Sequence, residues 1–183
     1  MNLSEKAKEI RKFPSILITL LEGIPKDQLI KKYPIDNWTI AQVVHHIADV
    51  HPNKFAQIRS ILVQNMELDN YEEKRWINLP GSNDPDLSPS LKIIEGVHER
   101  LALFLMGVNR EDLRKMALYD KVGEVTLERA IERFIDHGHE HIEQIKKSKR
   151  ISKIKMEMEL SGTKFNQVIS ELRKLLERDH RFY

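Results

Sequence analysis

Cysteine is absent from this chain of 183 residues. Its absence excludes disulfides, iron–sulfur clusters, thiolate zinc sites and a cysteine nucleophile, so any metal ion must be held by histidine, aspartate or glutamate. Hydrophobic runs are too short to span a bilayer, and the first residues lack the hydrophobic core of a signal peptide. We therefore expect a cytoplasmic protein.

An excess of charge of either sign is also missing, because 30 lysines and arginines stand against 28 aspartates and glutamates. No basic stripe is interleaved with aromatic residues, so neither nucleic acid nor a membrane is expected as a partner. A Ser-His-Asp order, a glycine-rich phosphate loop and an HExxH motif are absent as well. The content of 40% hydrophobic and 32% charged residues is typical of a soluble globular domain.

Helical periodicity dominates residues 1–148 and predicts an all-α protein built as a four-helix bundle. We expect Pro14 to kink or break the first helix and Pro52 to interrupt the second. Residues 79–89 have the composition of a loop. The expected N-caps are Ser4, Thr39, either Ser88 or Ser90, and Thr126.

The tail, residues 149–183, follows a different pattern and predicts a small C-terminal β-α appendage to the bundle of residues 1–148. Residues 153–160 (KIKMEMEL) alternate polar and hydrophobic side chains, which is the period of a half-buried strand. A helix with one hydrophobic face is expected after Gly162. The strand needs a partner, either a short hairpin around residues 119–125 or another subunit, so a homodimer is expected.

Histidines are the main candidates for functional side chains. Six of the 8 lie in two groups, residues 45–51 and 137–141. His137 and His141 are four residues apart, which places them on one face of a helix directed toward the core, while His139 points away. Two such imidazoles can bind a transition metal together. The alternative is a pair of surface histidines, or core histidines bonded to backbone carbonyls. Gly138, between them, would leave room for an ion or a ligand.

A third ligand should come from the first group, but spacing does not select it. His51 lies near the centre of the hydrophobic stripe, His46 on its edge and His45 off it, and a bend at Pro52 would weaken this comparison. His98 could face inward on the third helix, where a structural role is expected. From spacing alone the third ligand stays open.

Two segments resemble signatures of the DinB/YfiT-like superfamily. Residues 37–49 (NWTIAQVVHHIAD) resemble its W-[ST]-x-x-x-V-x-x-H-[LI]-A-D pattern, and residues 136–145 (DHGHEHIEQI) resemble its second signature, a histidine pair four apart. Residues 71–76 (YEEKRW) and 83–85 (NDP) look like the YfiT branch. The resemblance covers roughly residues 5–148. The tail has no counterpart in the superfamily pattern.

The resemblance implies that His46, His137 and His141 bind one divalent metal ion, zinc by default with nickel as an alternative. Glu140 departs from the pattern, since relatives often carry histidine there, but it faces away from the core. Members of this superfamily resemble metal-dependent hydrolases, and characterised relatives transfer low-molecular-weight thiols such as bacillithiol or mycothiol. The nucleophile would be a metal-bound water or thiolate, so no catalytic side chain is assigned.

Three functions are therefore compatible with the expected metal site. The first is a metal-dependent transferase that joins a small thiol to an electrophilic small molecule. The second is a metal-dependent hydrolase that uses metal-bound water. The third is a non-catalytic, stress-related bundle that the metal merely stabilises.

Other residues are candidates for supporting roles around the metal. His45, Asp49 and Asp136 could orient the imidazoles through hydrogen bonds, although solvated side chains are the alternative. Aromatic residues often line small-molecule sites, so Trp38 and Trp76, together with His51, are candidates for the pocket. Packing in the core or in a loop is the alternative for both tryptophans.

Overall fold

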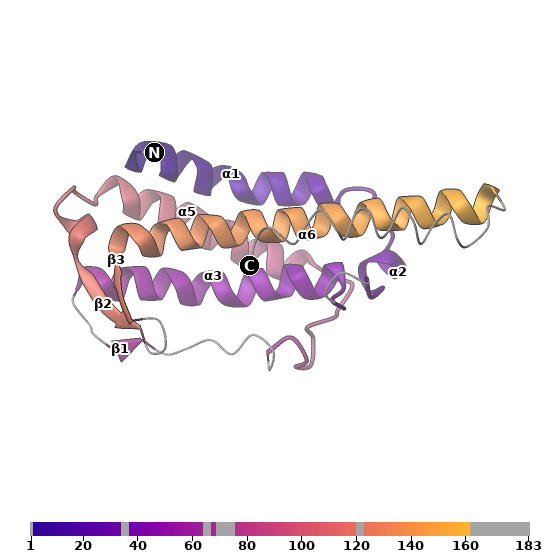
Figure 1. The fold of residues 1–183 in the computed structure, drawn as a ribbon, viewed down its shortest axis with the longest axis horizontal. Coiled ribbons are helices and arrows are strands. Elements are labelled where there is room, and N and C mark those ends of the chain that lie inside the picture. Colours follow the sequence, from indigo (N-terminus) through magenta and orange to yellow (C-terminus); the bar gives the residue numbers. More distant parts are fainter. Residues whose placement is uncertain (1, 34–36, 64–66, 69–75, 120–122, 162–183) are drawn as a thin grey trace.

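The computed structural model describes residues 2–33, 37–63, 67–68, 76–119 and 123–161. Four long helices lie side by side in the bundle that the sequence predicts (Figure 1). They are α1 (Leu3–Leu21), α3 (Ile40–Leu62), α5 (Ser88–Met106) and α6 (Leu127–Ser161). The shorter elements are α2 (Lys26–Leu29), η1 (Asp112–Arg114), β1 (Glu67–Leu68), β2 (Met116–Tyr119) and β3 (Gly123–Thr126). Among the described helices none has the length and hydrophobicity needed to cross a membrane.

Side-chain caps define where three of the long helices begin. The Thr39 hydroxyl accepts a hydrogen bond from the Gln42 backbone at 3.0 Å, and the Gln42 side chain accepts one from the Thr39 backbone, so the predicted cap is confirmed. Thr126 likewise accepts from the backbone of Arg129 at 3.2 Å. The prediction of Ser4 is wrong, because Asn2 and Glu5 form the capping box of α1.

Helix α5 begins at Ser88, one of the two predicted positions, but has no side-chain cap. Its first turn contains a proline instead, which is tolerated there because the first backbone N–H groups of a helix have no partner within it.

Neither internal proline ends its helix. Helix α3 continues through Pro52, so the predicted interruption is wrong, and buried side chains on both sides of it keep the segment packed in the core. Helix α1 continues through Pro14. Because proline has no N–H, the carbonyl of Ile10 loses its helical donor. This carbonyl instead accepts a hydrogen bond from Nδ1 of His98 at 2.8 Å.

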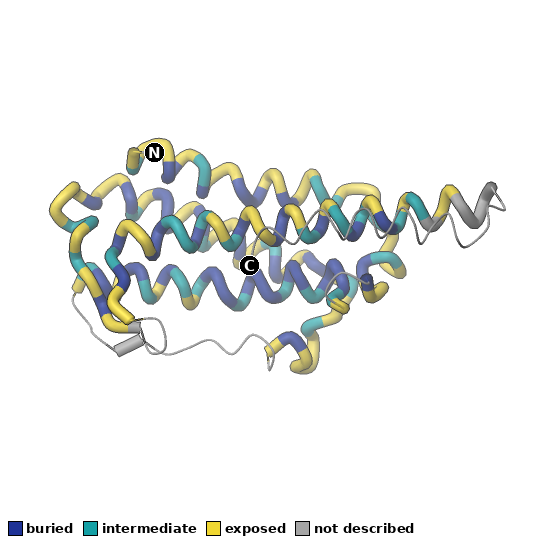
Figure 2. The backbone as a smooth tube through the Cα atoms, viewed as in Figure 1, coloured by how far each residue is buried: buried dark blue, intermediate teal, exposed yellow. Residues whose placement is uncertain are grey.

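The buried sides of the long helices face one another along the axis of the bundle (Figure 2). Helices α1 and α3 each pack against both α5 and α6. Hydrophobic side chains form two clusters, one on either side of the middle of the bundle. On α5 the clusters are separated at His98, and on α6 between Phe134 and Ile142. The buried histidines therefore lie where the two hydrophobic clusters meet.

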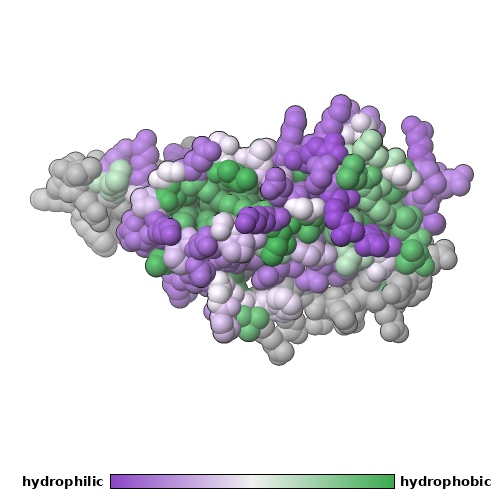
Figure 3. All heavy atoms as spheres, turned by 180° about the vertical axis from the view of Figure 1, so that it is seen from behind, coloured by the Kyte–Doolittle hydropathy of each residue, from purple (hydrophilic) through white to green (hydrophobic). Residues whose placement is uncertain are grey.

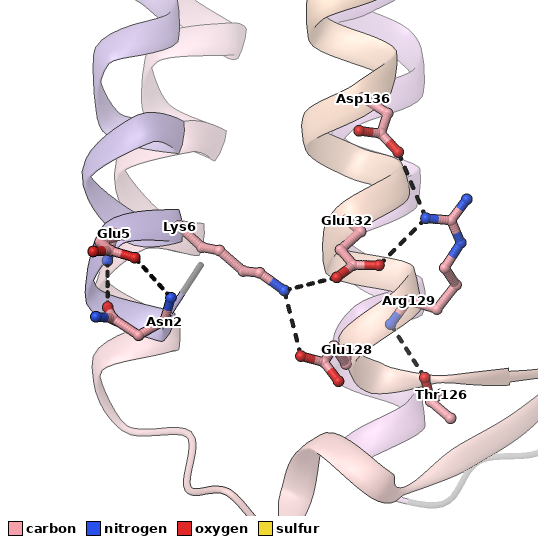
Figure 4. A network of polar contacts seen from close by, with 8 residues as sticks. All are labelled: Asn2, Glu5, Lys6, Thr126, Glu128, Arg129, Glu132 and Asp136. Atoms are coloured by element: carbon pink, nitrogen blue, oxygen red, sulfur yellow. Dashed lines mark hydrogen bonds and ion pairs between the residues drawn. The ribbon is translucent and has the colours of Figure 1, made fainter.

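Lys6 connects the N-terminal part of α1 to α6 through ion pairs (Figure 4). Its ammonium group lies 3.1 Å from a carboxylate oxygen of Glu132 and 3.6 Å from one of Glu128. The lysine side chain is almost completely buried, while both glutamates remain partly in solvent. The hydrogen bond from Lys6 is the main reason why the pKa of Glu132 is lowered.

A small sheet closes one end of the bundle, in the strand order β1-β2-β3. Strands β2 and β3 are antiparallel, with Met116 opposite Thr126 and Tyr119 opposite Gly123, which confirms the hairpin expected in this region. Most of the predicted turn, residues 120–122, lies outside the described residues. Strand β1 pairs with β2 in parallel.

The predicted tail strand is wrong, because residues 153–160 belong to helix α6. Lysine, methionine, glutamate and leucine are all good helix formers, and Lys153 forms an i,i+4 ion pair with Glu157 at 3.7 Å. Helix α6 thus passes through residue 149, where the appendage was expected to start. Whether residues 149–183 form a unit of their own stays a prediction, and the helix expected after Gly162 lies outside the described residues.

The opposite face of the molecule shows hydrophobic areas separated by hydrophilic ones (Figure 3). The large hydrophobic residues that are at least 40% exposed on α1 and α5 are Ile16, Ile18, Ile93, Leu103 and Met106.

Candidate metal centre

Three imidazole rings from two helices converge between the clusters. Helix α3 provides His46, and α6 provides His137 and His141. Nε2 of His137 lies 3.2 Å from Nε2 of His46 and 3.2 Å from Nε2 of His141. One ring nitrogen of each of the three lies within 4.8 Å of the others. The structure thus brings together the three residues that the family resemblance selected.

The two nitrogen–nitrogen distances of 3.2 Å fit ligands of one metal ion. A tetrahedral site with metal–nitrogen bonds of about 2.0–2.1 Å places its ligands about 3.3 Å apart. Nδ1 of His141 lies 2.6 Å from the side-chain oxygen of Gln144, which can only accept a hydrogen bond, so this nitrogen donates its proton. In the neutral ring, Nε2 of His141 then presents a lone pair toward His137, as a metal ligand must.

Burial keeps the rings of His46 and His137 uncharged near neutral pH. Desolvation is the main reason why the pKa of His46 is lowered to about 3 and that of His137 further still, and nearby histidines lower both. His46 and His141 are buried. Neutral imidazole is the form that binds metals, so near neutral pH no proton has to leave either His46 or His137 before an ion binds.

Trp38, a predicted pocket residue, lies beside the three converging histidines. Its ring meets the ring of His46 edge-on at a centroid distance of 5.1 Å and is stacked on that of His141 at 6.4 Å, with an interplanar angle of 18°. Trp38 comes directly before Thr39, the N-cap of α3.

Other predicted neighbours lie elsewhere. His45 uses both ring nitrogens away from the cluster, with Ser90 at 2.7 Å and the Asp84 carbonyl at 2.9 Å. The carboxylate of Asp136 faces Arg129 at 3.7 Å and is mostly exposed. His45 thus ties α3 to α5 and the loop before it, and Asp136 belongs to the outer face of α6.

Asp49 and Trp76 each accept a hydrogen bond through the backbone carbonyl. Asp49 accepts a hydrogen bond from Asn53 through its backbone carbonyl. Burial raises the pKa of its carboxyl group. The backbone carbonyl of Trp76 accepts from Ser82, and 40% of this residue is exposed.

Gly138 has a different role from the one predicted. A Cβ atom built on this residue would lie 2.8 Å from Cε2 and 3.1 Å from Cδ2 of Phe13 on α1. The glycine therefore lets α1 and α6 approach each other, and does not leave room for an ion. His139 points outward as expected and pairs with Glu9 at 3.0 Å.

The contacts of two supporting residues, Gln144 and His98, were not predicted from the sequence. Gln144 follows His141 by three residues, and this spacing could have indicated their contact. His98 follows Ile94 by four residues and so shares its buried face, but nothing in the sequence indicates which ring it meets. His51, a candidate for the pocket, is fully buried and contacts both His98 and His137.

A groove of about 500 Å³ lies between α1 and α6, and its lining includes Lys12, Ile16 and His139. None of the three converging histidines lines it. This groove therefore does not lead to the candidate metal centre.

A family model described as the DinB superfamily matches residues 9–145. The chain belongs to the DinB superfamily. The resemblance drawn from the two histidine-containing segments is thereby confirmed, and the match ends shortly before the part of α6 that extends into the tail.

Several proteins similar to this DinB member are described by their chemistry. A protein of Bacillus cereus (strain 03BB102) named "putative metal-dependent hydrolase" is 32% identical over 139 residues, which are 75% of this chain and 80% of that protein. One of the same description from Bacillus thuringiensis subsp. konkukian (strain 97-27) matches to the same extent. YfiT from Bacillus subtilis, described as a probable metal-dependent hydrolase with an unusual four-helix bundle topology, superposes with a TM-score of 0.77. Its sequence is 27% identical, and the match covers 81% of this chain and 86% of YfiT.

Proposed function

We propose that this DinB member is a metal-dependent enzyme in which His46, His137 and His141 bind one divalent ion. The observation that carries the proposal is the convergence of three imidazole nitrogens from α3 and α6. The descriptions of the similar proteins from Bacillus species support metal dependence. Zinc is the default ion for three imidazoles, and nickel is the alternative.

Three protein ligands are typical of catalytic rather than structural zinc sites, because they leave coordination positions open. An ion held there supplies Lewis-acid chemistry, activating a thiol or a water molecule as a nucleophile near neutral pH. The protein contributes the orientation of the ligands. Gln144 fixes the ring of His141, and the indole of Trp38 gives the site a flat, water-excluding side against which a small molecule can pack.

Two reactions use such a site. In the first, which follows from the family resemblance, a low-molecular-weight thiol attacks an electrophilic small molecule and displaces a leaving group. In the second, which the descriptions of the relatives favour, water attacks a small substrate and hydrolyses it. Both need the same three histidines and differ in whether turnover requires an added thiol.

The experiment begins with metal analysis of the purified protein beside two variants. We expect about one equivalent of metal in the wild type and a large loss in His141→Ala, because two remaining imidazoles bind far more weakly. His139→Ala is the matched control, since this histidine lies on the same helix but outside the cluster. Equal metal content in wild type and His141→Ala would refute the site.

Activity assays then separate the reactions. The metal-loaded protein is incubated with a halogenated aromatic electrophile and a panel of small thiols, and separately with a panel of esters and amides without thiol. Turnover that depends on a thiol supports the transferase, and turnover without thiol supports the hydrolase. Metal binding with no turnover in either panel favours the third function, a bundle that the metal merely stabilises.

We also propose a cytoplasmic location and a homodimer. Gel filtration with light scattering would test the homodimer. The strand that suggested a partner subunit is helical, so this reason no longer holds. The proposal of a dimer now depends on the hydrophobic positions expected after Gly162, which lie outside the described residues.

A further inference from the structure

Two fully buried histidines lie behind the metal ligands and have no part in the function proposed so far. His51 on α3 is 0% exposed and His98 on α5 is 2% exposed. Burying two polar rings in the middle of a bundle is unfavourable unless their nitrogens are hydrogen-bonded. Both nitrogens of both rings have partners.

These contacts form a continuous line, which we call the histidine chain: His98, His51 and His137. Nδ1 of His98 lies 2.8 Å from the carbonyl oxygen of Ile10. Nε2 of His98 lies 2.7 Å from Nδ1 of His51, and Nε2 of His51 lies 3.1 Å from Nδ1 of His137. The chain thus links α1 to a proposed metal ligand through two intervening rings.

The carbonyl of Ile10 sets the direction of every hydrogen bond in the chain. A carbonyl oxygen can only accept, so Nδ1 of His98 must donate. In a neutral imidazole the other nitrogen then accepts, which makes Nδ1 of His51 the next donor and Nδ1 of His137 the last. Burial lowers the pKa of His98 to about 4, so this ring is neutral near pH 7. The carbonyl is available because Pro14 lacks the N–H that would otherwise occupy it.

We propose that His51 and His98 are positioning residues that hold the proton of His137 on Nδ1 and so direct the lone pair of its Nε2 at the metal. The inference rests on the proposed metal site. Hydrogen bonds to the far nitrogen of a ligating histidine fix its tautomer and orientation, and removing them typically lowers metal affinity about 10–100-fold. In this protein the hydrogen-bond acceptor for the ligand is another histidine rather than a carboxylate.

Packing alone would not require histidine at these positions. The ring of His98 is stacked on Phe13 at a centroid distance of 4.6 Å, and the ring of His51 lies 4.3 Å from that of Phe134. Phenylalanine fills a similar space among these aromatic rings but has no nitrogen to accept the proton of His137. A comparison of phenylalanine with a polar replacement therefore separates filling of the core from orientation of the ligand.

The first measurement uses the metal-free wild type, so it does not depend on activity. Long-range ¹H–¹⁵N correlation spectra of histidine-labelled protein report which ring nitrogen carries the proton. We expect His137, His51 and His98 all to be protonated on Nδ1. Protonation of His137 on Nε2 would overturn the inference. Because this spectrum needs only the wild type, the test holds even if a variant fails to fold.

The second measurement is calorimetric titration with Zn²⁺ alone. We expect His51→Phe to lower affinity about 10–100-fold. We expect His51→Gln to recover most of the lost Zn²⁺ affinity, because its amide can both accept a hydrogen bond from His137 and donate one to His98. His139→Gln is the control and should bind as the wild type does. Wild-type affinity in His51→Phe, or no rescue by His51→Gln, would overturn the inference while leaving the proposed function intact. No binding of Zn²⁺ to the wild type would overturn the proposed function, and the inference with it.

Discussion

Single residues between the two hydrophobic clusters control how the protein responds to acid. We expect the metal-free protein to lose free energy of unfolding as the pH falls below about 6.5. Burial lowers the pKa of His98 from 6.5 to about 4 and that of His46 to about 3. Below about pH 6.5 the unfolded chain binds protons that the folded chain does not, so stability is present above this pH and is lost on acidification. Each such histidine contributes a slope of at most about 1.4 kcal/mol per pH unit.

Urea unfolding at about pH 7, 6 and 5 in the presence of a chelator measures this slope. His98→Phe has one titrating group fewer and should show a shallower dependence on pH, whatever its absolute stability. Equal slopes in the two proteins would show that His98 takes up its proton as readily in the folded state as in the unfolded state.

The sequence identified the three converging histidines better than it identified their surroundings. Spacing placed His137 and His141 on one helix face, but only the family resemblance selected His46 over His45 and His51. The roles of Gly138 and His98 depend on how closely α1 approaches α6 and α5. That distance follows from packing between segments far apart in the chain, so no local pattern could have revealed it.

At the scale of the helices, the contact between α1 and α6 is tight at Gly138. We expect Gly138→Ala to destabilise the protein by up to about 2 kcal/mol. Its Cβ atom would lie 2.8 Å from the ring of Phe13, which cannot move freely because it is stacked on His98. Overpacking costs about 1–3 kcal/mol, and alanine recovers about 1 kcal/mol of helix propensity.

The control for this substitution is Gly96→Ala on α5. A Cβ atom at Gly96 meets nothing within 4 Å, so only the gain in helix propensity remains and this variant should be more stable than the wild type. Denaturant unfolding measures both variants. A stabilised Gly138→Ala would mean that the two helices can separate at little cost.

Helices were predicted more reliably than their ends and interruptions. The periodic hydrophobic stripes located all four long helices, and Thr39 and Thr126 marked two of their starts. Pro52 failed as a signal of interruption because buried side chains on both sides hold α3 in the bundle. The alternation in residues 153–160 failed because helix propensity and the continuing α6 outweighed a period of two.

For the molecule as a whole, the proposed metal binding is linked to folding, because the three proposed ligands come from α3 and α6 and meet only in the folded bundle. We expect Zn²⁺ at about 100 times its dissociation constant to raise the free energy of unfolding by about 2.7 kcal/mol, and a chelator to reverse the gain. Thermal or urea unfolding with and without the ion measures the change. His141→Ala should not respond, and an equal response in both proteins would indicate binding elsewhere.

Pro14 has a consequence for anyone who redesigns this protein. By propensity alone it is the least favourable residue in α1, and a design aimed at thermostability would replace it with alanine for a gain of up to about 3 kcal/mol. The replacement would bring back an amide that competes with His98 for the carbonyl of Ile10. If the histidine chain has its proposed role, a more stable N-terminal helix would then come with a less well oriented His137, the proposed metal ligand. Optimising this protein for heat and optimising it for metal binding would call for opposite choices at one position.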